Sequence, residues 1–160
     1  MIEEWKNKKS HIGKAQKKIV RKLSAHKGKH LDRFAEETHD KVFSELDCLD
    51  CANCCTSIPP IVNKTDAVRI AKHLGMKPAE FEAKYLTIDE DKDTVMNQSP
   101  CPFLMEDNAC FIYDVRPKAC REYPHTNNFE FSKNMGYHAQ NAQYCPAVFH
   151  ILERLNKGVI

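Results

Sequence analysis

The sequence predicts a mostly α-helical fold with a small β-hairpin, built as a compact single domain around irregular cysteine loops. Apolar residues recur at helical spacing in several segments that Pro and Gly separate. Eight cysteines stand among 160 residues, and most of them lie in two groups. A chain of this length with 42% hydrophobic residues is enough for one domain with a modest core. We divide it into a basic helical N-terminal arm, residues 1–30, and a cysteine-rich domain, residues 31–160.

The arm differs from the rest of the chain in charge. Residues 1–30 hold ten Lys and Arg against two acidic residues, whereas residues 31–160 hold 14 against 20. A helix over residues 5–27 with a thin apolar stripe is expected there. Such an arm is either a solvated helix without a partner or a segment that contacts nucleic acid, an acidic protein surface or the chain's own acidic body. Because the cysteines and the main apolar pattern lie downstream, we expect deletion of residues 1–28 to leave the core folded.

The later elements are predicted from apolar periodicity and from helix start and stop residues. In chain order they are a helix over 31–47, a helix after the N-cap Thr65 that ends at Gly75, a helix from Pro78 to Leu86, a short strand over Thr94–Met96, a hairpin with arms 101–104 and 109–113, a helix from Pro117 to Tyr123, a loop-rich stretch over 125–144 and a last helix from Pro146.

The cysteines are the candidate site residues. The first group is Cys48, Cys51, Cys54 and Cys55, in which two-residue gaps allow several sulfurs to face one ion. The adjacent pair requires an irregular backbone to reach one ion, or it serves two centres. The second group is Cys101, Cys110, Cys120 and Cys145. Cys55 and Cys145 are also the strongest candidates for ordinary buried thiols.

Metal binding explains these thiols better than disulfides do. The N-terminus lacks the apolar core of a secretory signal, and no run approaches the ~18 uncharged residues of a membrane span. We therefore expect a cytoplasmic protein with reduced thiols and no membrane contact. Two zinc sites of four thiolates, one per group or interleaved, and an iron–sulfur cluster are both open. The predicted fold is accordingly metal-centred.

Cations near the cysteines would offset the negative charge of a thiolate site. The candidates are Arg69, Arg116, Lys118 and Arg121, with ion pairs at helix ends as the alternative. His125 is the histidine nearest to a cysteine segment and is either a ligand or a surface residue. The histidines form no H-E-x-x-H motif, and no cysteine has a His or Asp partner in sequence that marks nucleophilic catalysis. No catalytic residue is therefore assigned and no organic cofactor is expected.

The cysteine spacing, together with Tyr113, Arg116-Pro117, Cys120-Arg121 and Tyr123-Pro124, resembles the bacterial YkgJ-type cysteine-cluster family of zinc- or iron-chelating domains. The resemblance covers roughly residues 45–150. That family is similar to a portion of flagellin lysine N-methylases, which are proposed to carry an iron–sulfur cluster. The resemblance implies that the cysteines bind a metal.

The sequence thus predicts a metal-binding protein whose clustered thiolates hold zinc, iron or an iron–sulfur centre. The alternative is an iron–sulfur enzyme or electron carrier acting in protein lysine modification. A metal ion or cluster is the expected partner, and a protein partner is a further expectation. Nucleic acid is not expected, because the basic segment lacks interleaved aromatic residues and the body is acidic.

Overall fold

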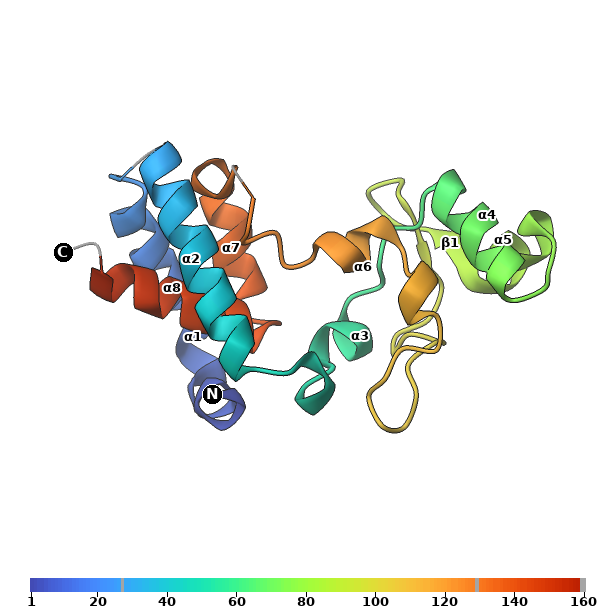
Figure 1. The fold of residues 1–160 in the computed structure, drawn as a ribbon, viewed down its shortest axis with the longest axis horizontal. Helices are drawn as coiled ribbons and strands as arrows, with labels where there is room; N and C mark the ends of the chain where they lie inside the picture. The colour runs from blue at the N-terminus through green and yellow to red at the C-terminus, as the bar shows by residue number, and fades with distance from the viewer. Residues whose placement is uncertain (27, 129, 159–160) are drawn as a thin grey trace. The chain divides into compact units, whose positions relative to one another are not determined.

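The computed structural model describes residues 1–26, 28–128 and 130–158. It confirms the predicted class, since the described residues are mostly helical with one antiparallel pair of short strands (Figure 1). Contacts divide the chain into two compact units. The helical unit comprises Met1–Cys51 and Pro124–Ile160, and the central unit comprises Ala52–Tyr123.

The helical unit is built from long amphipathic helices. Its elements are α1 (Ile2–Leu23), α2 (Lys29–Glu45), η1 (Cys48–Asp50), η3 (Phe131–Lys133), α7 (Met135–Asn141) and α8 (Pro146–Gly158). Helix α8 packs against both α1 and α2, and α7 packs against α1. Helix α7 lies in the stretch that was predicted to be loop-rich. The sequence did not predict this helix because its apolar stripe is too short to show a period.

Helix α1 belongs to this core. Its buried residues Trp5, Ile12, Ile19 and Leu23 lie in the same apolar cluster as the residues of α8. The Trp5 indole N–H also donates a 2.8 Å hydrogen bond to the carbonyl of Ala142. The contacts therefore do not follow the boundary expected at residue 30. The many lysines of α1 are exposed and dominate its composition. The composition of the segment therefore does not show that α1 contributes to the core.

The central unit is smaller and more irregular. Its elements are α3 (Asn53–Ser57), α4 (Lys64–His73), α5 (Pro78–Tyr85), β1 (Leu86–Ile88), β2 (Thr94–Met96), η2 (Tyr113–Val115) and α6 (Lys118–Glu122). Its core is one cluster around Phe81, Phe103 and Ile112. Helix α4 begins with a capping box between Asn63 and Asp66, two residues before the predicted N-cap.

The small hairpin is present, but at a different place from the predicted one. Strands β1 and β2 pair antiparallel, with Thr87 opposite Val95. In the predicted hairpin over 101–113, the structure has a single bridge between Leu104 and Cys110. Pro102 has no N–H to donate to a ladder, and turns follow on both sides of the bridge, so these arms do not extend into strands.

Candidate metal centre

The structure describes all eight predicted cysteines, and none of them is in a disulfide bond. The two units do not separate the cysteines into the two groups of the sequence. The central unit contains Cys54, Cys55, Cys101, Cys110 and Cys120, whereas the helical unit contains Cys48, Cys51 and Cys145. Each unit thus combines members of both sequence groups.

Backbone hydrogen bonds bring three cysteines of the central unit together. The Cys101 amide donates to the carbonyl of Cys55 over 2.8 Å, although 46 positions separate the two residues in sequence. The turn that follows joins Cys101 to Cys110, because the Phe111 amide donates to the Phe103 carbonyl over 2.8 Å. Cys101 and Cys110 both pack against the core of the central unit.

Electrostatics adds Cys120 to this group. Burial, followed by the thiolate charges of Cys55, Cys101 and Cys110, raises the pKa of the Cys120 thiol to about 12. Such repulsion falls with distance, so the four sulfurs share one neighbourhood. We refer to Cys55, Cys101, Cys110 and Cys120 as the central thiol group.

Backbone N–H groups and one arginine favour negative charge at this group. Burial is the largest effect and raises the pKa of Cys101 and of Cys110. Backbone amides oppose this rise, because those of Phe103 and Leu104 donate to the Cys101 sulfur and that of Ile112 donates to the Cys110 sulfur. Arg116 also lowers the pKa of Cys110 and Cys120.

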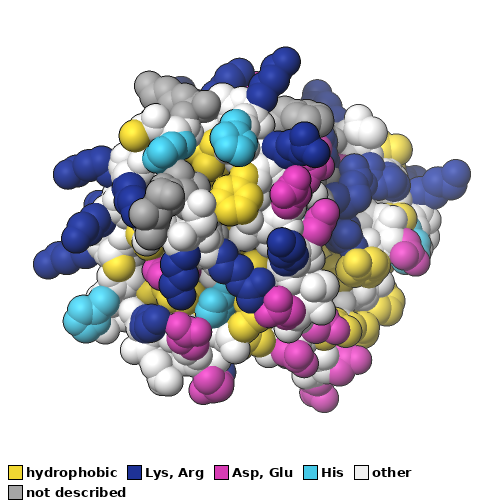
Figure 2. All heavy atoms as spheres, turned by 60° about the vertical axis from the view of Figure 1, so that its left-hand side comes forward, with side chains coloured by type: hydrophobic (Ala, Val, Ile, Leu, Met, Phe, Trp, Pro, Cys, Tyr) yellow, Lys and Arg dark blue, Asp and Glu magenta, His cyan; other side chains and the backbone are white. Residues whose placement is uncertain are grey.

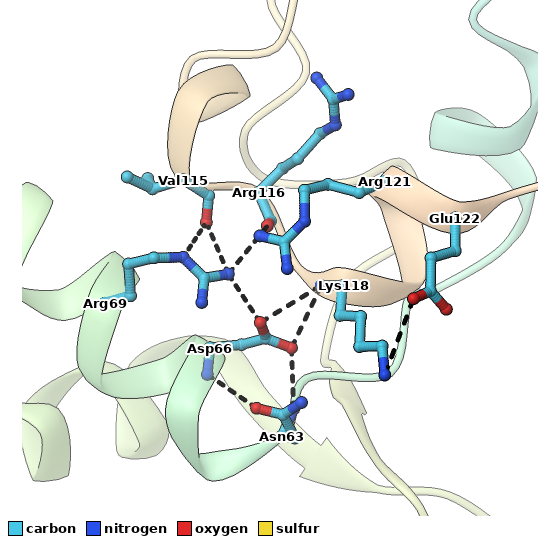
Figure 3. A network of polar contacts seen from close by, with 8 residues as sticks. All are labelled: Asn63, Asp66, Arg69, Val115, Arg116, Lys118, Arg121 and Glu122. Atoms are coloured by element: carbon cyan, nitrogen blue, oxygen red, sulfur yellow. Dashed lines mark hydrogen bonds and ion pairs between the residues drawn. The ribbon is translucent and has the colours of Figure 1, made fainter.

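The other predicted cations make contacts elsewhere (Figure 3). Arg69 pairs with Asp66 at 2.6 Å, and Arg121 donates to the Arg116 carbonyl over 3.1 Å. The exposed Lys118 side chain pairs with Glu122 at 3.7 Å. Among the four predicted cations, Arg116 is therefore the one whose charge acts on the thiols.

The adjacent cysteines lie on the short helix α3. Consecutive side chains point in different directions on a helix, so Cys54 and Cys55 do not have the irregular backbone expected of two ligands to one ion. Their thiols nevertheless hydrogen-bond each other, and this bond, followed by burial, raises the pKa of Cys55.

The helical unit holds a second thiol group, Cys48, Cys51 and Cys145. Cys145 directly precedes α8, and its sulfur accepts the amides of Ala147 and Val148. Burial, followed by the charges of Cys48 and Cys51, nevertheless raises the pKa of Cys145 to about 12. His125 is in the same unit, where its ring lies 5.7 Å from that of Tyr137.

In the part of the chain that the structure describes, no three or more His, Cys, Asp or Glu side chains form a ready-made metal-binding group. The central thiols are thus gathered without converging on one point. Their chemistry fits a soft or borderline metal, because all four donors are sulfur and both N–H groups and Arg116 offset thiolate charge. Zinc and iron are the metals that such a set holds.

All eight cysteines lie within a region that matches a known family. A family model named CxxCxxCC, "Putative zinc- or iron-chelating domain", matches residues 47–146, well over half of the chain. The protein therefore belongs to this family, as the cysteine spacing predicted. No curated protein and no solved structure matches the chain. Within the described residues, no helix is long and apolar enough to cross a bilayer.

Sequence reasoning missed Asp66, which is buried beside the segment that carries Arg116 and Cys120. The signal for it was present. Asn63 and Asp66 have the spacing of a capping box, whereas the predicted N-cap was Thr65.

Proposed function

We propose that this protein binds a zinc or iron ion through the central thiol group and that the ion stabilises the central unit. The observation that carries the proposal is the backbone pairing that brings Cys55, Cys101 and Cys110 together, through the 2.8 Å bond from the Cys101 amide to the Cys55 carbonyl and the turn that follows it. The charges of these three thiolates also raise the pKa of Cys120. Partly buried thiolates that repel one another are unfavourable without a cation, and a divalent metal removes that repulsion.

The local chain supports thiolate binding. Amides near Cys101 and Cys110 donate to sulfur, which is the arrangement that stabilises metal-bound thiolates. The 2.8 Å bond between Cys101 and Cys55 holds two of the donors on neighbouring backbone. The role of Cys54, next to this set, is not assigned.

A structural role for the metal follows from the small core of the central unit. That core is one apolar cluster, and the two strands of the central unit have three residues each. Metal binding can contribute ~10 kcal/mol or more of folding free energy to small domains held by thiolates. We therefore infer that folding of the central unit and metal binding are coupled.

The second thiol group supplies ligands for a further centre in this proposal. Cys145 has two amide donors and electrostatic neighbours in Cys48 and Cys51, which is the same pattern as in the central unit. Three thiolates leave one position of a tetrahedral site for another donor.

The test is metal analysis of the full-length protein purified without oxygen. We expect metal bound per chain, together with a fall in melting temperature when a strong chelator removes it. A colourless zinc protein indicates a structural role, whereas a brown protein with broad absorption indicates an iron–sulfur centre and favours electron transfer or an enzyme. Protein that contains no metal, and that added zinc or iron does not stabilise, would contradict the proposal.

A further inference from the structure

Helix α4 contacts the segment between Cys110 and Cys120 through a polar network that contains no cysteine (Figure 3). The Arg69 guanidinium donates to the carbonyls of Val115 and Arg116, at 3.3 Å and 3.0 Å. The same group pairs with the carboxylate of Asp66 at 2.6 Å. One side chain of α4 thus binds two consecutive carbonyls in the segment between Cys110 and Cys120.

Asp66 contacts the start of α6. Its carboxylate accepts the amide of Lys118 at 3.2 Å and also takes part in the capping box of α4. Lys118 is the first residue of α6, the five-residue helix that carries Cys120. The residue before it, Pro117, has no side-chain oxygen to cap this helix, so Asp66 supplies the acceptor from another element.

The carbonyl contacts also fix Arg116. Its carbonyl accepts from both Arg69 and Arg121, and Figure 3 shows its side chain extending away from these two residues. The Arg116 guanidinium lies 3.8 Å from the centre of the Tyr113 ring. The backbone is thus held on one side, while the positive charge of the side chain lowers the pKa of Cys110 and Cys120.

We propose that Asp66 and Arg69 are positioning residues of the metal centre, which set the place of Cys120 and of the Arg116 charge without touching the metal. This inference rests on the proposed function, since it concerns the same central thiol group. The Asp66 side chain is only 3% exposed, and a buried charge needs compensation. Arg69 and the surrounding backbone amides provide it. A planar, forked cation is needed to reach the carboxylate and two carbonyls together, which a lysine ammonium cannot do.

The decisive variant is therefore Arg69→Lys, which keeps the positive charge beside Asp66 but loses the fork. Its matched control is Arg154→Lys in the helical unit. Arg154 makes a two-pronged pair with Glu45, at 2.9 Å and 2.7 Å, remote in sequence from the central cysteines. Asp66→Asn is a second variant, which removes the buried charge while keeping the side-chain shape.

The first measurement is affinity for zinc and cobalt in full-length protein, by competition with a chromophoric chelator. Changes in contacts that orient metal ligands cost 10–100-fold in affinity, and we expect a loss in that range for Arg69→Lys and Asp66→Asn but not for Arg154→Lys. The thiolate-to-cobalt absorption band should also weaken, because Cys120 no longer coordinates fully. Wild-type affinity and an unchanged band in Arg69→Lys would overturn the inference.

The second measurement uses metal-free protein, so that it does not depend on the proposed function. Alkylation of each cysteine is followed by mass spectrometry, with circular dichroism to confirm that the helices are retained. We expect Cys120 to react faster in Arg69→Lys and Asp66→Asn than in the wild type and in Arg154→Lys. Equal Cys120 reactivity in all four proteins overturns the positioning role. A wild-type protein that binds neither metal overturns the proposed function instead.

Discussion

The amide of Cys101 donates a 2.8 Å hydrogen bond to the carbonyl of Cys55, and this contact joins the two cysteine groups of the sequence. It places the last cysteine of the first group beside the first cysteine of the second group. Each candidate centre is therefore assembled from distant parts of the chain, as structural metal sites commonly are.

The central thiol group should lose its metal when one member is replaced. Cys120→Ser exchanges a soft thiolate for a hydroxyl that hardly ionises, so we expect a steep loss of zinc affinity at this site. The measurement is protection of cysteines from alkylation by added zinc. Cys101 and Cys110 should be protected in the wild type and reactive in Cys120→Ser.

Cys145→Ser is the matched control, because Cys145 belongs to the other thiol group. Zinc should still protect Cys101 and Cys110 in this variant. If the central cysteines lose protection in Cys145→Ser, or keep it in Cys120→Ser, the proposed division of ligands is incorrect.

The sequence was sufficient for the helical class and for the family, whereas the role of the cysteines as metal ligands stays a prediction. Helix starts at Pro78 and Pro146, and the stop at Gly75 with a φ of +70°, follow from local backbone chemistry and were predicted well. The interleaving of the cysteines depends on contacts such as that between Cys101 and Cys55, which leave no local pattern.

The role of α1 illustrates a second limit. Ten basic residues made residues 1–30 look like a separate arm, although Trp5, Ile12 and Leu23 are buried. These apolar residues are spread widely along the helix, and charge statistics say nothing about the face on which each residue lies. The deletion of residues 1–28, expected from sequence to be tolerated, should therefore unfold the helical unit.

Trp5 provides a point test of this core. Trp5→Ala removes a buried ring and its hydrogen bond to Ala142, so we expect a loss of about 3–5 kcal/mol in the free energy of unfolding. Urea denaturation measures this change. Val68→Ala, at a position that is 53% exposed, should change stability by less than about 0.5 kcal/mol. A change equally small in Trp5→Ala would show that α1 does not anchor the core.

The cationic face of α1 should be electrostatically unfavourable. Lys14, Lys18 and Lys22 are exposed and four residues apart, so like charges face each other along the helix. The face of the molecule drawn in Figure 2 likewise carries many Lys and Arg side chains. Lys18→Glu turns two repulsions into two attractions and should raise stability by about 0.5–1 kcal/mol in low salt. The gain should shrink at high salt, and a salt-independent gain would point to another cause.

His138 should make the helical unit sensitive to mild acid. Its ring is buried and stacked on Phe131 at 4.2 Å, and Nε2 lies 3.2 Å from the Phe131 carbonyl. Among the described residues, Nδ1 has no hydrogen-bond partner, so a proton there would be buried without an acceptor. Burial accordingly lowers the pKa of His138 to about 4.

A pKa below that of the unfolded chain, about 6.5, means that the unfolded state binds a proton first as the pH falls. The stabilising effect of neutral His138 is therefore complete above pH ~6.5 and is lost progressively towards pH ~4, by a total of about 3 kcal/mol. His138→Gln, which cannot titrate, should lose this part of the dependence, whereas the exposed His73→Gln should keep it. Urea unfolding at several pH values between 4 and 7 measures the difference. An unchanged slope in His138→Gln would show that another group causes the acid sensitivity.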